Sequence, residues 1–249
     1  MARAWTLLAA AAAVACAARA AHLPADWKRC SQNDPKFDEC LVEAIQDTLP
    51  KLKNGVRELD MLPLDPLEIT ALEIDKGDGP VGIGLKFKNM KIYGISDSII
   101  TKHNSDPSKY NLEGDTITPK LTIEADYEAD GKVLLLPVKG KGKSKIIMTD
   151  LKSHLTHKAV PAEKGGKIYR NETEFIYTME PAHMEMNFEN LLNAGKTIDE
   201  NMNKFLNENW KEIFAELKPT LETALSRIFL NISRGVFLKV PFDEMFPKK

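Results

Sequence analysis

The segment from Gly140 to Ser144 has a composition that suits phosphate binding, because it reads Gly-Lys-Gly-Lys-Ser. A P-loop needs another glycine five residues before the Gly-Lys-Ser triplet, where it opens the turn that holds the phosphates. Pro137 occupies that place, and no long helix is indicated after the segment. Gly82 and Gly84 lack the third glycine of a dinucleotide-binding fingerprint, since Phe87 stands there. Neither nucleotide-binding interpretation holds.

The histidines and serines do not form a metal or catalytic pattern. No H-E-x-x-H motif occurs, and His154 and His157 are three apart in a predicted strand, which places them on opposite faces. A nucleophile–base pair would need Ser144 or Ser153 beside His154, but neighbouring strand residues also point to opposite faces. No G-x-S-x-G elbow occurs either. We therefore predict no catalytic residue, no metal site and no cofactor, and we expect that the protein is not an enzyme.

The first 20 residues indicate secretion. Arg3 supplies a positive charge, residues 7–18 are apolar, and Ala18-Arg19-Ala20 forms an A-x-A cleavage site, as in secretory signal peptides. The apolar run holds 12 residues, too few for a membrane span of roughly 20. We predict a signal peptide over 1–20, a single lipid-binding domain over 21–249, and no stable membrane insertion.

Charge and cysteine content fit an extracellular protein that does not bind nucleic acid. Removal of residues 1–20 leaves 32 basic and 36 acidic side chains, interspersed along the chain, without the basic surface of a nucleic-acid binder. Cys16 leaves with the signal peptide, so Cys30 and Cys40 are expected to form one disulfide in an oxidising compartment. Asn171 and Asn231 begin glycosylation sequons.

Apolar periodicity predicts one helix followed by a long run of strands. Residues recur at spacings of three and four from Pro35 to Lys53, which indicates a helix. From Leu67 to Phe188 the period is two, in short segments that favour antiparallel strands. This alternation places Ile117 on the same face as Leu121, and turn signals occur at 129–131 and 163–166. Glycines inside several segments permit strong curvature or the close approach of another element.

A second helical region occupies the C-terminal part of the chain. Apolar residues from Ile198 to Ile232 fall at helical spacing and form a stripe wide enough for a helix buried along much of its girth. Pro219 predicts a kink or two abutting helices there. Gly235 predicts the end of the helix, and 236–240 a closing strand. A long apolar helix beside a curved sheet predicts an α+β fold in which the sheet wraps the helix and encloses an elongated hydrophobic tunnel.

The expected tunnel lining consists of inward-facing apolar and aromatic residues of the strands and the C-terminal helices. They are Val81, Ile83, Leu85, Phe87, Leu121, Ile123, Leu135, Ile146, Met148, Phe175, Tyr177, Met179, Met184, Met186, Phe188, Phe205, Ile213, Leu217, Leu221 and Phe229. Each alone is expected in any packed core, but methionines among them suit an adaptable cavity.

Several segments resemble the insect takeout family, relatives of the haemolymph juvenile hormone binding proteins. They are the pair Cys30 and Cys40, residues 64–67 (Leu-Asp-Pro-Leu), residues 131–137 (Gly-Lys-Val-Leu-Leu-Leu-Pro), and 188–219, which ends in Glu-Leu-Lys-Pro. The resemblance covers essentially the whole chain after residue 20. Juvenile hormone binding proteins proper have a second disulfide, and the absence of a cysteine beyond Cys40 favours the takeout branch.

The resemblance implies a tubular lipid-binding fold and a secreted carrier that holds a terpenoid, fatty-acyl or quinone-like ligand without a covalent bond. Two alternatives stay open. One is an enzyme acting on a lipid or hormone ester, and the other is a secreted signalling protein with a structural lipid. We expect a monomer, and leave open whether a receptor takes part.

Overall fold

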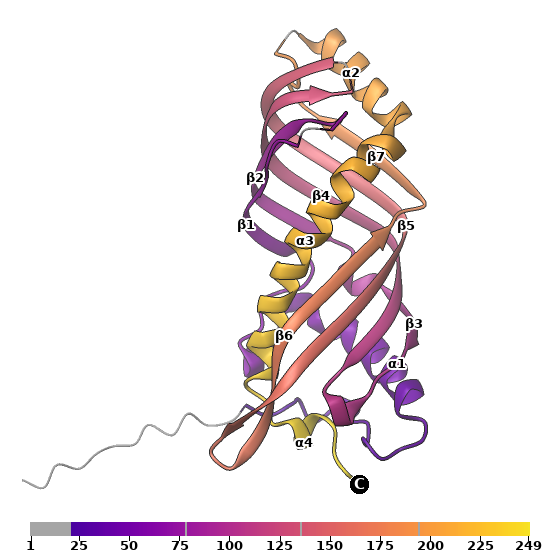
Figure 1. Ribbon diagram of the computed structural model, residues 1–249, viewed down its shortest axis with the longest axis vertical. Coiled ribbons are helices and arrows are strands. Elements are labelled where there is room, and N and C mark those ends of the chain that lie inside the picture. Colours follow the sequence, from indigo (N-terminus) through magenta and orange to yellow (C-terminus); the bar gives the residue numbers. More distant parts are fainter. Residues whose placement is uncertain (1–20, 78, 135, 194) are drawn as a thin grey trace, which may run out of the picture.

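The chain folds as a strongly curved sheet wrapped around one long helix, α3 (Trp210–Phe237), as Figure 1 shows. This confirms the predicted α+β architecture. The computed structural model describes residues 21–77, 79–134, 136–193 and 195–249. The signal peptide predicted over 1–20 lies outside these residues and stays a prediction.

The sheet has seven antiparallel strands, and two of them run along most of its length. The strands are β1 (Leu67–Ile74), β2 (Ile83–Tyr93), β3 (Ile99–His103), β4 (Leu112–Val133), β5 (Leu136–Lys164), β6 (Lys167–Glu180) and β7 (His183–Phe188). In the upper half, β4 pairs with β2 and β5 pairs with β7. In the lower half, β4 pairs with β3 and β5 pairs with β6. The central hairpin β4–β5 therefore runs through both halves of the sheet, and different strands border it in each half (Figure 1).

The two halves meet at the point where the alternation of inward-facing and outward-facing residues in β4 and β5 shifts by one residue. Thr118 pairs with Leu151 and Lys120 pairs with Thr149, so Pro119 and Asp150 are left out of the ladder opposite each other. Pro119 has no N–H to donate to a ladder, and Asp150 has a positive φ of 46°. An unpaired residue in each strand shifts the alternation by one, because strand side chains alternate with period two.

This shift makes one sequence-based expectation wrong. Ile117 is half-buried on the outer face opposite Lys152, while Thr116 and Thr118 beside it face inward. The alternation from Leu121 onward holds, but it does not extend back across Pro119. The reason is the break in the ladder, which the apolar pattern alone does not reveal.

The helices begin and end elsewhere than predicted at three points. α1 (Phe37–Thr48) continues as a 3-10 turn over Leu49–Asn54, because Pro50 has no N–H for an α-helical bond. The C-terminal region forms two helices, α2 (Lys196–Glu208) and α3, and the break lies at Asn209. The Asn209 side chain donates to the Phe205 carbonyl at 2.8 Å, which caps α2. α3 continues through the exposed Pro219, where water can hydrate the freed carbonyl.

Two glycines, one predicted to lie in a turn and the other to end a helix, instead lie inside regular elements. Gly131 belongs to β4, and a Cβ there would lie 2.2 Å from the Gly82 carbonyl oxygen, so this glycine permits close strand contact. The turn comes after Val133 instead. Gly235 stays helical, the predicted closing strand over 236–240 is absent from these described residues, and α4 (Phe242–Met245) follows Pro241. Glycine marks both turns and sites of close packing, and only the packing distinguishes them.

Two other strand glycines explain how the upper end of the sheet closes. A Cβ on Gly140 would lie 2.3 Å from the Asn190 carbonyl oxygen, and one on Gly142 would lie 2.6 Å from that of Glu189. The segment after β7 therefore crosses directly over the backbone of β5. Side chains larger than hydrogen would push this segment away.

Side chains of α2 and α3 complete the edges of the sheet. Asn203 and Asn207, one helical turn apart on α2, each accept an N–H and donate to a carbonyl of β7, at Phe188 and Met186 respectively, with distances of 2.7–2.9 Å. On α3, Glu222 accepts the Met179 N–H at 2.8 Å. These bonds take the place of a further strand.

The core has two parts. The larger lies between the concave face of the sheet and helices α2 and α3, and it surrounds the candidate site. The smaller lies at the lower end, where α1 and α4 pack together. Cys30 and Cys40 form the predicted disulfide beside this smaller core.

Candidate functional site

A cavity of about 320 Å³ lies between the concave face of the sheet and α3. Of the 32 side chains that line it, 27 are apolar and five carry a hydroxyl group, and none of these lining residues is charged. Binding pockets for small molecules typically measure about 300–1,000 Å³ and are mostly apolar with a few polar groups. The cavity therefore has the size and chemistry of a site for a small hydrophobic molecule.

The cavity is long and narrow because it follows one face of α3. The helix contributes Ile213, Phe214, Leu217, Leu221, Leu225 and Phe229, spaced mostly by four residues. From Ile213 to Phe229 the helix rises about 24 Å. A small volume spread over this length suits an extended chain better than a compact ring system.

Sixteen of the twenty predicted lining residues lie on this cavity. They are Leu85, Phe87, Leu121, Ile123, Ile146, Met148, Phe175, Tyr177, Met179, Met184, Met186, Phe188, Ile213, Leu217, Leu221 and Phe229. Val81 and Ile83 are buried in the core beyond its upper end, and Phe205 is half-buried against the same core. Leu135 lies outside the described residues. Whether the sixteen contact a ligand stays a prediction.

Two features of the structure explain why half of the other sixteen lining residues were not predicted. The first is the shift of strand parity, which also occurs at Asn89 in β2, where φ is 51°. Beyond it Met90 and Ile92 face inward, and beyond Pro119 and Asp150 so do Thr116, Thr118, Ser153 and Leu155. The second is tertiary packing of α1 and of the 3-10 turn after it, which brings Ile45 and Leu49 to the lower end of the cavity. Restarting the apolar alternation after Asn89 would have identified Met90 and Ile92.

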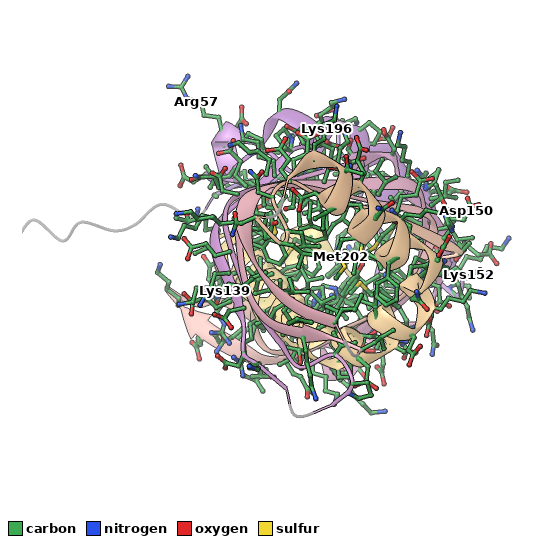
Figure 2. All side chains as sticks on the ribbon, turned by 90° about the horizontal axis from the view of Figure 1, so that it is seen from above. Arg57, Lys139, Asp150, Lys152, Lys196 and Met202 are labelled. Carbon is green, nitrogen blue, oxygen red and sulfur yellow. A yellow bond between two sulfur atoms is a disulfide. The ribbon has the colours of Figure 1, made fainter. Side chains whose placement is uncertain are left out.

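Helix α2 covers the upper end of the cavity. Figure 2 looks down the long axis and shows Met202 in the interior, whereas Arg57, Asp150 and Lys152 lie at the periphery. Met202 and Leu206 on one face of α2 are 4 % exposed. Because Asn203 and Asn207 bind β7 from the same helix, α2 is held in this position by polar contacts to the sheet edge.

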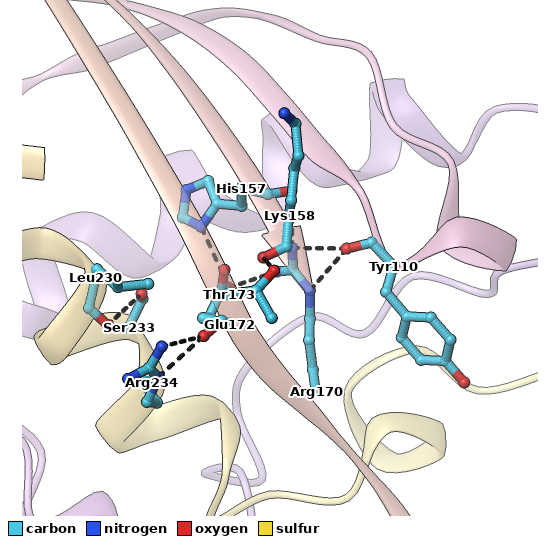
Figure 3. Close-up of polar contacts among 9 residues, drawn as sticks. All are labelled: Tyr110, His157, Lys158, Arg170, Glu172, Thr173, Leu230, Ser233 and Arg234. Atoms are coloured by element: carbon cyan, nitrogen blue, oxygen red, sulfur yellow. Dashed lines mark hydrogen bonds and ion pairs between the residues drawn. The ribbon is translucent and has the colours of Figure 1, made fainter. Parts of the chain in front are cut away.

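A buried charged cluster supports the lower wall of the cavity (Figure 3). Arg170 and Glu172 on β6 are fully buried, and their side chains meet at 2.8 Å. Arg170 also donates to the carbonyl oxygens of Tyr110 and His157. Burial lowers the pKa of Arg170 to about 10, so the guanidinium stays charged at neutral pH. The His157 ring packs on Phe175, a cavity residue, with ring centres 4.2 Å apart.

This cluster also fixes the end of α3. Arg234 donates two hydrogen bonds, of 2.6 and 2.9 Å, to the Glu172 carbonyl oxygen (Figure 3). Together with the bonds to Tyr110, they join the loop before β4, strand β6 and α3. The charged groups thus hold three segments in place outside the cavity rather than facing its interior.

The arrangement of Ser153 and His154 does not form a nucleophile–base pair. Ser153 lies on the cavity and its hydroxyl contacts the Tyr177 hydroxyl at 2.9 Å. The His154 ring points to the opposite face of β5, where it contacts Asp115 at 2.7 Å. Among the described residues, no group of three His, Cys, Asp or Glu side chains is placed to hold a metal ion. Within the same residues, no helix is both long and apolar enough to cross a membrane.

Residues 7–247 match the family described as haemolymph juvenile hormone binding protein (JHBP). The match spans nearly the whole chain. The chain belongs to this family. The resemblance found in the sequence is confirmed, and the curved sheet around one long helix is the fold that the family relationship predicts.

Individual relatives support this assignment. The circadian clock-controlled protein daywake of Drosophila melanogaster is 27 % identical over 236 residues, which cover 91 % of this chain and 89 % of that protein. A putative beta-carotene-binding protein of Schistocerca gregaria is 22 % identical and covers 86 % of each chain. The crystal structure of Epiphyas postvittana takeout 1 superposes with a TM-score of 0.77 at 26 % identity, and the match covers 88 % of this chain and 99 % of that one.

Proposed function

We propose that this family member is a secreted carrier that binds an elongated hydrophobic small molecule in its cavity without a covalent bond. Candidate ligands are terpenoids that resemble juvenile hormone, fatty acids and quinone-like lipids. The observation that carries the proposal is the narrow cavity, with 27 apolar lining residues and no charged one among them. The predicted signal peptide and the Cys30–Cys40 disulfide support secretion.

Binding would be driven by removal of the ligand's apolar surface from water. Each buried methylene contributes about 0.8 kcal/mol, which corresponds to about a fourfold gain in affinity. Uncharged chains of increasing length should therefore bind about fourfold more tightly per added methylene until the chain exceeds the cavity. This series is measured by displacement of the uncharged fluorophore N-phenylnaphthylamine.

The matched variants for this assay are Leu221→Trp and Ala215→Trp. Leu221 lies on the cavity near the middle of its helical wall, and the larger indole would fill space that the ligand needs. Ala215 is exposed on the same helix, so an indole there leaves the cavity unchanged. We expect Leu221→Trp to abolish binding of the longer chains and Ala215→Trp to bind as the unmodified protein does. Equal binding by the two variants, or no chain-length dependence, would contradict the proposal.

A further inference from the structure

Each of the five polar residues on the cavity wall carries an uncharged hydroxyl group. They are Ser98, Thr116, Thr118, Ser153 and Tyr177. Buried hydroxyls away from partners cost free energy, so their grouping in an otherwise apolar channel needs an explanation. Only Tyr177 followed from the alternation of the sequence, because the parity shift at Pro119 and Asp150 turns three of the others inward.

The register of the sheet places these hydroxyls next to one another. Thr116 on β4 pairs directly with Ser153 on β5, which brings their Cβ atoms to about 4.5–5.5 Å. The Ser153 hydroxyl contacts that of Tyr177 on β6 at 2.9 Å. Thr118 lies two residues beyond Thr116 on the same face, and its hydroxyl contacts that of Ser98 at 2.7 Å. The five residues form a continuous strip across the lower cavity, which we name the hydroxyl band.

The hydroxyl band has more donors than the protein uses. In the pair Ser98–Thr118, one hydroxyl donates to the other, so one O–H hydrogen is left over, and the same holds for Ser153–Tyr177. The Thr116 hydroxyl has no hydrogen bond to another described residue. Up to three O–H donors therefore face the cavity, and burial raises the pKa of Tyr177, so its hydroxyl keeps its proton at neutral pH.

An uncharged oxygen atom of a ligand could accept the free O–H donors of this band. A carbonyl, ester or epoxide oxygen can accept several hydrogen bonds and costs little to remove from water. An ionised carboxylate is far more costly to bury, and no lysine, arginine or histidine is among the lining residues to neutralise it. A pure hydrocarbon leaves the band without an acceptor.

We propose that the hydroxyl band is a subsite for a neutral oxygen function, and that it selects esters and ketones of long apolar chains over ionised fatty acids and hydrocarbons. This inference rests on the proposed carrier function and assigns the class of ligand within it. The apolar wall supplies most of the affinity, and the band supplies the discrimination.

The test compares three ligands of similar length in displacement of N-phenylnaphthylamine at neutral pH. They are methyl palmitate, heptadecane and palmitate, where heptadecane matches the ester in its number of carbon atoms. We expect the unmodified protein to bind methyl palmitate about 3–10-fold more tightly than heptadecane, as one or two net hydrogen bonds allow. Palmitate should bind more weakly than its methyl ester.

The double variant Tyr177→Phe with Ser153→Ala removes both hydroxyls of one pair, because after loss of only one the O–H of the other would still be free to bind the ligand. Its matched control is Tyr127→Phe with Ser144→Ala. Tyr127→Phe removes a hydroxyl that donates to the Glu189 carbonyl oxygen, and Ser144→Ala removes one that donates to that of Ala125. Neither control residue lines the cavity. The double variant should lower the ester-to-hydrocarbon affinity ratio to about one to three, whereas the double control should keep it. Because both ligands are measured on the same variant, a general packing defect cancels in this ratio.

The outcomes separate this inference from the carrier function. If the unmodified protein binds all three ligands equally, or if the double variant and the double control keep the same ratio, the subsite is refuted while the carrier function stands. If none of the three ligands displaces the fluorophore, the carrier function itself fails. Tighter binding of palmitate than of its ester would also overturn the inference.

Discussion

Removal of the Glu172 charge tests whether the buried cluster holds the lower wall of the cavity. In Glu172→Gln, the Arg170 guanidinium stays fully buried without its counter-charge. Breaking a buried ion pair by removal of one partner costs about 3–5 kcal/mol, because the remaining charge is uncompensated. For a chain of this size, each kcal/mol lowers Tm by about 2–4 °C. The expected loss is therefore about 6–20 °C.

The measurement is thermal and urea unfolding followed by circular dichroism, with an exposed pair as control. Lys145 and Glu124 meet at 2.9 Å, but their side chains are 52 % and 46 % exposed. Glu124→Gln should cost less than about 1 kcal/mol, because water screens surface pairs. The contact distances of the two pairs are nearly equal, so the comparison isolates the effect of burial.

A double variant separates an unpaired charge from lost packing. Arg170→Met combined with Glu172→Leu removes both charges and keeps apolar volume, and such replacements are often neutral or stabilising. It should recover most of the stability that Glu172→Gln loses. The reasoning is refuted if Glu172→Gln is as stable as Glu124→Gln, or if the double variant is no more stable than Glu172→Gln.

Two further predictions concern pH and glycine. Burial lowers the pKa of His103 from 6.5 to about 4. Between these pH values the unfolded chain binds a proton that the folded chain does not bind. The free energy of unfolding should therefore fall by about 3 kcal/mol as pH drops from 6.5 to 4. In urea unfolding at a series of pH values, His103→Gln should flatten this dependence of stability on pH, whereas His183→Gln, at an exposed position, should not. An unchanged slope in His103→Gln would contradict the prediction. Gly140→Ala should cost about 2 kcal/mol or more, because its Cβ would lie 2.3 Å from a backbone oxygen. Gly235→Ala, which meets no atom within 4 Å inside α3, should stabilise the protein by about 0.5–1 kcal/mol, and denaturation of the two variants in the reverse order would refute both assignments.

Local periodicity was sufficient to predict the main elements of the fold. Runs such as Met184, Met186 and Phe188 alternate without interruption, so their inward face followed from the period alone. The α3 stripe from Ile213 to Phe229 was equally regular. The inward faces of these segments could be predicted from periodicity because each segment has one face to bury, whatever the rest of the chain does.

What the sequence could not supply are features that depend on contacts between distant residues. Gly131 and Gly235 predicted a turn and a helix end, yet a neighbouring strand explains the first and the exposed surface of a continuing helix accommodates the second. Pro219 predicted a break that instead lies at Asn209, where a side chain caps α2. Each residue type is compatible with several local structures, and packing selects among them.

The sequence by itself thus determined the curved sheet around a long apolar helix and most of the apolar lining. The tertiary structure alone decided four of the five polar residues of the site. Pro119 and Asp150 are 31 positions apart in the chain but opposite each other in the sheet. Only their joint exclusion from the ladder turns Thr116, Thr118 and Ser153 toward the cavity, because the alternation of side chains along a strand depends on an uninterrupted ladder with its partner.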